Sequence, residues 1–121
     1  MSDLKSIAQM FGSSGVDTFL GLPACTNLDM IEAKAAILGV PVATPYKSVG
    51  NYCANAPEAI RAAIAPWAAN LEHSDFDFGE PLFPDGLITA VDCGNLTYDE
   101  SDFAANRAAI KDAVIKMVHS G

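Results

Sequence analysis

The strongest pattern along the chain is a run of apolar residues at 35–40, with the sequence Ala-Ala-Ile-Leu-Gly-Val. Apolar side chains occupy both of its faces, as in strands of a parallel sheet that helices cover on both sides. A second apolar run at 87–92 is followed by the turn-forming residues Cys-Gly-Asn at 93–95. We therefore predict two buried strands, at 35–40 and 87–92, and a turn at 93–95.

A helix is predicted after the first strand and a loop at 43–56. Residues 57–65 have a helical period of apolar positions. Asn55 and Glu58 have the spacing of a capping box, in which each side chain bonds a backbone N–H group at the start of the helix. Arg61 is expected near the buried face or in solvent. The predicted buried face consists of three residues: Ile60, Ala63 and Ile64.

The clearest helical pattern lies at the end of the chain. Thr97 and Glu100 again have capping-box spacing, so this helix is predicted to run from there to about His119. Positive charge in its last turns, at Lys116 and His119, suits the negative end of the helix dipole. The stripe expected to pack in the core consists of Phe103, Ile110, Val114, Met117 and Val118.

We expect residues 1–34, before the first strand, to form an N-terminal arm. Residues 1–17 have the pattern of a short amphipathic helix, and residues 18–23 form a compact apolar segment that ends in a turn. Residues 35–121 then have the order strand, helix, strand, helix, which defines an α/β fold with a parallel sheet. Strands that are apolar on both faces need neighbours, so we interpret 35–121 as the first part of a larger α/β domain.

Composition narrows the classes of partner. Fifteen acidic residues against seven basic ones give the 121-residue chain a net charge of -8. Nucleic acids and anionic membranes select clusters of Lys and Arg, so we expect neither as a partner. The sequence has no apolar run of membrane-spanning length and no pattern of a signal peptide. We therefore expect a cytoplasmic protein.

Cysteine, histidine and acidic residues offer few candidate ligands. The three cysteines have no CxxC spacing, so they are interpreted as reduced, small apolar side chains. The acidic loop at 75–80 is interpreted as solvated, with a metal site as the weaker alternative, and His73 as a surface residue. Asp92, at the end of the second predicted strand, keeps two interpretations, a cap for the following turn or a functional carboxylate.

The loop at 43–56 is the principal candidate for function. Ligands of α/β proteins bind at the carboxyl ends of the strands, and a loop of this length is uncommon without a role. Its residues include adaptable polar groups and two tyrosines, which is the composition of a pocket wall. An ordinary surface loop remains the alternative.

Four segments, in this order and at this spacing, resemble the N-terminal portion of the ureohydrolase family, the arginase and agmatinase group, and its agmatinase-like members in particular. Thr-Phe-Leu-Gly-Leu-Pro at 18–23 resembles the family's arm. Ala-Ile-Leu-Gly-Val-Pro at 36–41 resembles its first strand, and Ala-Pro-Glu-Ala-Ile-Arg at 56–61 the start of its first helix. Val-Asp-Cys-Gly-Asn at 91–95 is similar to the Val-Asp-x-Gly-Asp of its second strand, and the helix at 106–121 follows as in the family.

The resemblance implies a three-layer α/β/α fold around an eight-stranded, mainly parallel sheet, in a trimer or hexamer. It implies hydrolysis of a guanidino C–N bond with release of urea, by a hydroxide that bridges two divalent ions, manganese or nickel. The family's ligand motifs (Gly-Gly-Asp-His, Asp-x-His-x-Asp and Asp-x-Asp) do not occur in the 121 residues, and His73 and His119 match no ligand position. Any metal ligands are therefore expected outside this chain.

The loop departs from the family pattern, because both arginines of Arg-Pro-Gly-x-Arg are missing. This departure leaves agmatine, another guanidine, an amidine or a biguanide-like compound as alternative substrates. By the loop's position in the family, we expect Tyr46, Asn51 and Tyr52 to contact the substrate.

Three hypotheses follow. The chain is the N-terminal part of a ureohydrolase-type amidinohydrolase, or a non-catalytic subunit of the same fold that pairs with a catalytic one. The altered loop, and Asn95 where the family usually has Asp, motivate the second hypothesis. The third is a small acidic binding module.

Overall fold

The computed structural model describes residues 18–42, 48 and 52–120. The helix predicted over 1–17 lies outside the described residues, as does most of the loop at 43–56. Within these described residues, seven elements follow one another: η1 (Phe19–Gly21), β1 (Ala35–Gly39), α2 (Ala56–Ile64), η2 (Ala65–Asn70), η3 (Pro84–Gly86), β2 (Ala90–Asn95) and α3 (Phe103–Ser120), where η denotes a short 3-10 helix.

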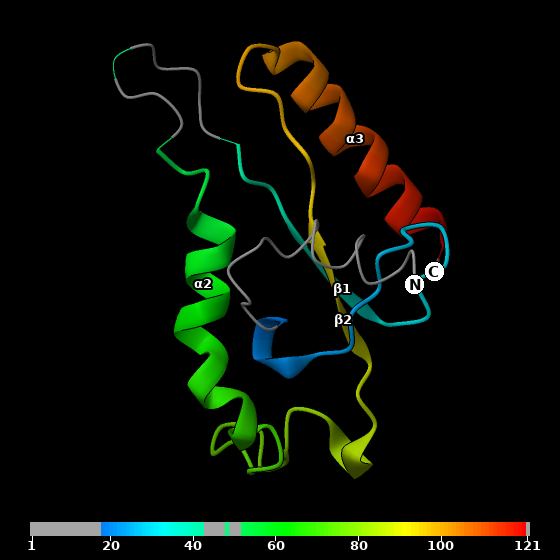
Figure 1. Ribbon diagram of the computed structural model, residues 1–121. Coiled ribbons are helices and arrows are strands. Elements are labelled where there is room, and N and C mark those ends of the chain that lie inside the picture. Colours follow the sequence, from blue (N-terminus) through cyan, green and yellow to red (C-terminus); the bar gives the residue numbers. More distant parts are fainter. Residues whose placement is uncertain (1–17, 43–47, 49–51, 121) are drawn as a thin grey trace, which may run out of the picture.

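The two strands are parallel neighbours joined through α2, which confirms the α/β class and the parallel pairing. Ala35 pairs with Ala90 and Ile37 with Asp92. Helices α2 and α3 lie on opposite sides of the strand pair (Figure 1). This strand–helix–strand unit brings the carboxyl ends of β1 and β2 to the same end of the molecule.

The arm adds a short second pairing along the other edge of β2. Ala24 forms an isolated parallel bridge with Asp92. The Asp92 N–H donates to the Pro23 carbonyl, and the Cys25 N–H donates to the Asp92 carbonyl, both at 2.9 Å. At Asp92, β2 therefore lies between β1 and the arm.

The second strand was predicted three residues too early, and the predicted turn at 93–95 is wrong. These residues belong to β2, and Cys93 is fully buried. The register shifts between Ile37 and Gly39, because two steps along β1 correspond to three along β2. Gly94 takes up this extra residue with a φ of 73°, a left-handed conformation that favours glycine. Leu87 and Ile88 are exposed.

Helix α2 has nearly the predicted length, but its packing differs from the prediction. Asn55 occupies the N-cap position without a side-chain capping bond, so the predicted capping box is wrong. Ile60, expected in the core, is 57 % exposed, whereas Arg61 is only 2 % exposed. The helix turns Arg61 inward because the carboxylate of Asp92 lies on the sheet beneath it.

Helix α3 begins at Phe103, several residues later than predicted. Asp102 caps it, since its Oδ1 accepts the Ala105 N–H at 3.0 Å. The residues before it fold back, and the Asn106 side chain bonds the Asp99 N–H and carbonyl at 2.8 and 2.7 Å. Asn106 and Ala113 are the buried positions of this helix.

The predicted core stripe of α3 is therefore partly wrong. Val114 and Val118 are exposed, and the stripe that faces the strands consists of Phe103, Asn106, Ile110, Ala113, Met117 and Ser120. This face includes the small or polar side chains of Asn106, Ala113 and Ser120, which apolar periodicity does not mark as core positions.

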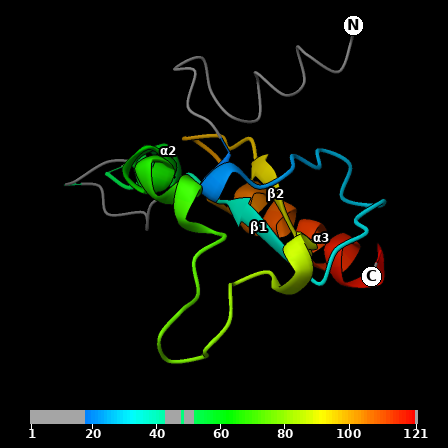
Figure 2. The same ribbon diagram turned by 90° about the horizontal axis from the view of Figure 1, so that it is seen from below.

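The connection between α2 and β2 extends away from the strands as a loop (Figure 2). All its residues from 72 to 80 are exposed. Asp75 organises one turn, because its Oδ1 accepts the N–H groups of Asp77 and Phe78 at 2.8 and 3.3 Å. Within the described part of the chain, no helix is both long and apolar enough to cross a membrane.

Candidate functional site

The carboxylate of Asp92 is the centre of the described structure. It is completely buried on the central strand β2. Its Oδ2 accepts the Phe19 N–H at 2.7 Å and Arg61 Nε at 2.8 Å. Its Oδ1 accepts Arg61 Nη2 and the Gly94 N–H, both at 2.9 Å. Both oxygens are thus held by protein groups from the arm, α2 and β2.

Arg61 closes the cluster from the helix side. Besides its bidentate pair with Asp92, it donates Nη1 to Asn95 Oδ1 at 2.5 Å and Nη2 to the Gly94 carbonyl at 3.1 Å. A planar guanidinium suits this arrangement because its donors have a fixed fork geometry. Hereafter Asp92, Arg61, Gly94 and Asn95 are called the ion-pair cluster.

Electrostatics keep this pair charged. Burial alone raises the pKa of the Asp92 carboxyl, but the Arg61 hydrogen bonds, the N–H groups of Phe19 and Gly94 and the charge of Arg61 lower it further than burial raises it. The pKa of Asp92 is therefore below its ordinary value. Because protein groups already occupy both oxygens of this buried carboxylate, the structure favours a structural role over a functional one for Asp92.

Close packing at Gly39 completes the cluster. A Cβ at this position would overlap the Asn95 amide oxygen and lie 3.0 Å from the Pro57 Cβ. The absence of a side chain at Gly39 therefore lets the start of α2 and the end of β2 approach β1. Close packing around Gly39 therefore accounts both for the glycine near the end of β1 and for the position of Pro57 at the start of α2.

A polar pocket of about 330 Å³ opens at the carboxyl ends of the two strands. Pro41 follows β1, Tyr98 follows β2, and Glu58 comes from the first turn of α2. Asn95 joins this pocket to the ion-pair cluster. Its remaining lining residues are Ala54, Asn55, Leu96 and Thr97. This is the position at which α/β sheets bind ligands.

Of the three residues predicted to contact a substrate, Tyr52 alone lies within the described residues, and it does not line this pocket. Tyr52 is 56 % exposed and contributes to none of the cavities described here. Tyr46 and Asn51 lie outside the described residues. Sequence reasoning missed Glu58 and Tyr98, which it had assigned to helix starts. The signal that would have found them is their position directly after a strand or in the first turn of a helix at the carboxyl edge.

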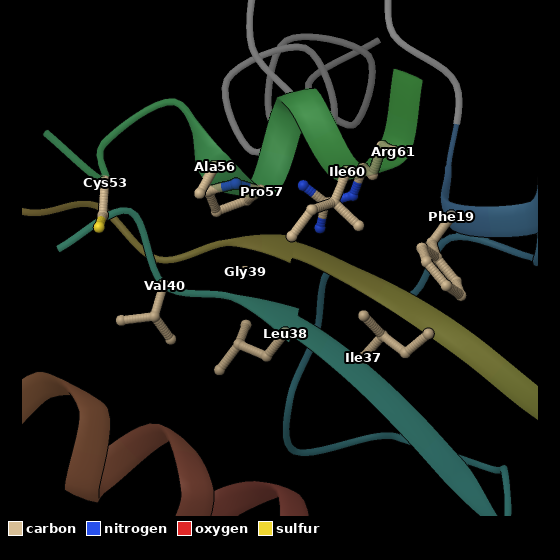
Figure 3. A pocket seen from close by; sticks show the side chains of 10 residues that line it. All are labelled: Phe19, Ile37, Leu38, Gly39, Val40, Cys53, Ala56, Pro57, Ile60 and Arg61. Atoms are coloured by element: carbon tan, nitrogen blue, oxygen red, sulfur yellow. The ribbon is translucent and has the colours of Figure 1, made fainter. Parts of the chain in front are cut away.

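A second cavity, of about 310 Å³, lies between β1 and α2 and is mostly apolar. Ile60 and Arg61 reach into it from α2, with Phe19 beside them, while Leu38 and Val40 point to the opposite side, toward α3 (Figure 3). Cys53 lines its outer end. A polar ligand would find few hydrogen-bond partners in this cavity, because Arg61 already bonds the other members of the ion-pair cluster.

The described residues do not fit a pair of divalent ions. Among them, no three side chains of His, Cys, Asp or Glu gather closely enough to hold a metal ion. In the acidic loop, Asp75 bonds backbone N–H groups instead, and His73 is exposed.

Comparison of the chain with models of known protein families finds no match, and comparison with curated protein sequences finds none either.

Proposed function

We propose that this chain is the N-terminal part of a ureohydrolase-type amidinohydrolase, which cleaves a guanidino C–N bond and releases urea. The observation that carries the proposal is the meeting of all four motif segments at one point. Phe19 of the arm and Asp92 of β2 are 73 residues apart, yet they share a hydrogen bond. Gly39 of β1 contacts Asn95, and Arg61 of α2 bonds Asp92.

This convergence supports the proposal because the matched segments contribute to one buried cluster and do not lie on separate parts of the surface. A Gly-x-Pro strand ending, a Pro-x-Ala-Ile-Arg helix start and a Val-Asp-x-Gly strand each supply one part of the same buried cluster. The finer architecture is part of the proposal: a three-layer α/β/α domain in a trimer or hexamer. Its two divalent ions, manganese or nickel, would be held by ligands outside these 121 residues.

In this proposal the polar pocket forms one wall of the substrate site. A guanidinium is planar and cationic, so it pairs with a carboxylate and lies well against an aromatic ring. Glu58 supplies a half-buried carboxylate, and Tyr98 supplies a half-buried ring. The acidic balance of the chain, -8 overall, also favours a cationic substrate.

The test uses the protein purified as its own cell makes it, with its intact mass and metal content measured and urea release assayed on guanidine-type compounds. Release that depends on manganese or nickel supports the proposal. Glu58→Gln should then raise KM about 10-fold at nearly unchanged kcat, the size of a charged hydrogen bond lost at a partly exposed site. Glu100→Gln, on the exposed turn before α3, is the matched control and should leave KM unchanged.

Other outcomes would overturn the proposal. Guanidine binding without urea release, in a protein that copurifies with an active relative, would indicate a non-catalytic subunit. A protein of this chain's mass that neither binds guanidines nor responds to metal would indicate a small acidic binding module.

A further inference from the structure

Cys25 of the arm and Cys93 of β2 are neighbours across a parallel pairing. Ala24 bridges Asp92 in parallel, and each cysteine follows its bridge partner by one residue. The two hydrogen bonds that define the bridge, from Asp92 N–H to Pro23 and from Cys25 N–H to Asp92, fix this register. Residues in register on adjacent parallel strands point to the same face, and both thiols therefore lie on the face opposite the Asp92 side chain.

The spacing suits a disulfide. Adjacent strands lie about 4.8 Å apart, and disulfides join Cα atoms about 4.4–6.8 Å apart. The two thiols also interact with each other. Burial raises the pKa of the Cys93 thiol to about 11, and the charge and hydrogen bond of the Cys25 thiol contribute to that rise. The Cys25 Sγ is anchored by weak contacts to the carbonyls of Asn27 and Met30, at 3.5 and 3.8 Å.

Accessibility differs between the two cysteines in the way that a stepwise exchange requires. Cys25 is half-buried and open to a small oxidant, whereas Cys93 is fully buried. An attacking thiolate must be reachable, but a resolving thiol needs only to reach its neighbour.

We propose that Cys25 and Cys93 form a reversible disulfide by exchange with a low-molecular-weight disulfide such as oxidised glutathione. The Cys25 thiolate attacks one sulfur of the oxidant, forms a mixed disulfide and releases one glutathione thiolate. The Cys93 thiol then loses its proton and attacks the Cys25 sulfur, which releases the second glutathione. The protein dithiol is oxidised by two electrons, and the glutathione disulfide is reduced to two thiols.

The bond would fasten the arm to β2 beside the ion-pair cluster. Phe19, which donates its N–H to Asp92, lies six residues before Cys25 on the same arm. Oxidation would therefore add a covalent bond to a contact that otherwise depends on hydrogen bonds. This inference does not rest on the proposed hydrolase activity.

The test uses the full chain, equilibrated under native conditions with reduced and oxidised glutathione, alkylated, and digested with trypsin without reduction. Cleavage after Lys and Arg separates the three cysteines into residues 6–34, 48–61 and 62–107. We expect peptide 6–34 linked to peptide 62–107, with the loss of two hydrogen atoms in the intact mass. Peptide 48–61, which contains Cys53, should carry the alkyl group.

Variants sharpen the result. Cys25→Ser should abolish the linked peptide completely, while Cys53→Ser should leave it unchanged. Cys93 is buried and its replacement risks misfolding, so Cys25→Ser is paired with a second measurement. Tm should rise on oxidation in the wild type and in Cys53→Ser, and not in Cys25→Ser. Glutathione retained on Cys25, a link to peptide 48–61, or two free thiols at equilibrium with oxidised glutathione would each overturn the proposal.

Discussion

Replacement of Asp92 by Asn tests whether the ion-pair cluster holds this part of the fold together. The substitution keeps the shape of the side chain but removes its charge. Asp92 accepts four hydrogen bonds, two on each oxygen. An amide keeps one oxygen and places an NH2 donor against the other two donors, so at most two of the four bonds survive.

The loss of stability follows from the charge that remains on Arg61. Arg61 keeps its charge at a site that is 2 % exposed. Breaking one partner of a buried ion pair costs about 3–5 kcal/mol, because the other buried charge loses its counter-charge. Whole domains have stabilities of about 5–15 kcal/mol. We therefore expect Asp92→Asn to lower the free energy of unfolding by about 4 kcal/mol and Tm by about 10–20 °C.

The assay is urea unfolding at neutral pH, followed by far-ultraviolet circular dichroism. Asp112→Asn, the same change at an exposed position of α3, is the matched control and should stay within about 0.5 kcal/mol of the wild type. The double variant Arg61→Met with Asp92→Leu should cost less than the sum of the two single changes, since no charge is left unpaired. Equal stability losses in Asp92→Asn and Asp112→Asn would refute the reasoning.

Three further predictions follow from the same structure. Because the folded pKa of Asp92 is below its ordinary 3.8, its contribution is full at neutral pH and declines as the pH falls below about 4; acid titrations of stability should show this loss in the wild type and not in Asp92→Asn. Gly39→Ala should cost about 1–3 kcal/mol by overpacking, and less when Asn95→Ala removes the overlapping amide, as thermal unfolding would show. Asp102→Ala should cost about 1 kcal/mol by loss of the N-cap of α3; an equal loss on Glu100→Ala would contradict the capping role.

The order of elements could be predicted from the sequence, because it depends on local patterns. The strand at β1 and the helix at α2 are each within one residue of the prediction. Their parallel pairing followed from apolar residues on both faces of the strands. The α2 packing could not be predicted in the same way: Ile60 has the right period for a core position, but the buried residue is Arg61.

The burial of Arg61 depends on Asp92, 31 residues away, and no periodicity encodes that contact. The error at β2 has a different source. Gly and Asn are turn formers in most contexts, and only the pairing with β1 shows that Gly94 takes up an extra residue inside a strand. The general location of the candidate site, at the carboxyl ends of the strands, was predicted, and Ala54 and Asn55 of the loop at 43–56 line the pocket there. Its other described lining residues were not predicted. Glu58 and Tyr98 reach the pocket through the fold, and the sequence presents them only as helix-start residues.

The ion-pair cluster also constrains how this sequence can change over time. A substitution at Asp92 alone removes the counter-charge of the buried Arg61 guanidinium, and one at Arg61 alone removes the counter-charge of the buried Asp92 carboxylate. Each single substitution therefore lowers the stability of the protein. A joint change to two apolar side chains has no such barrier once both are in place. Substitutions at positions 61 and 92 are therefore expected to be correlated. Among natural descendants of this sequence, the two residues should be either both retained or both replaced.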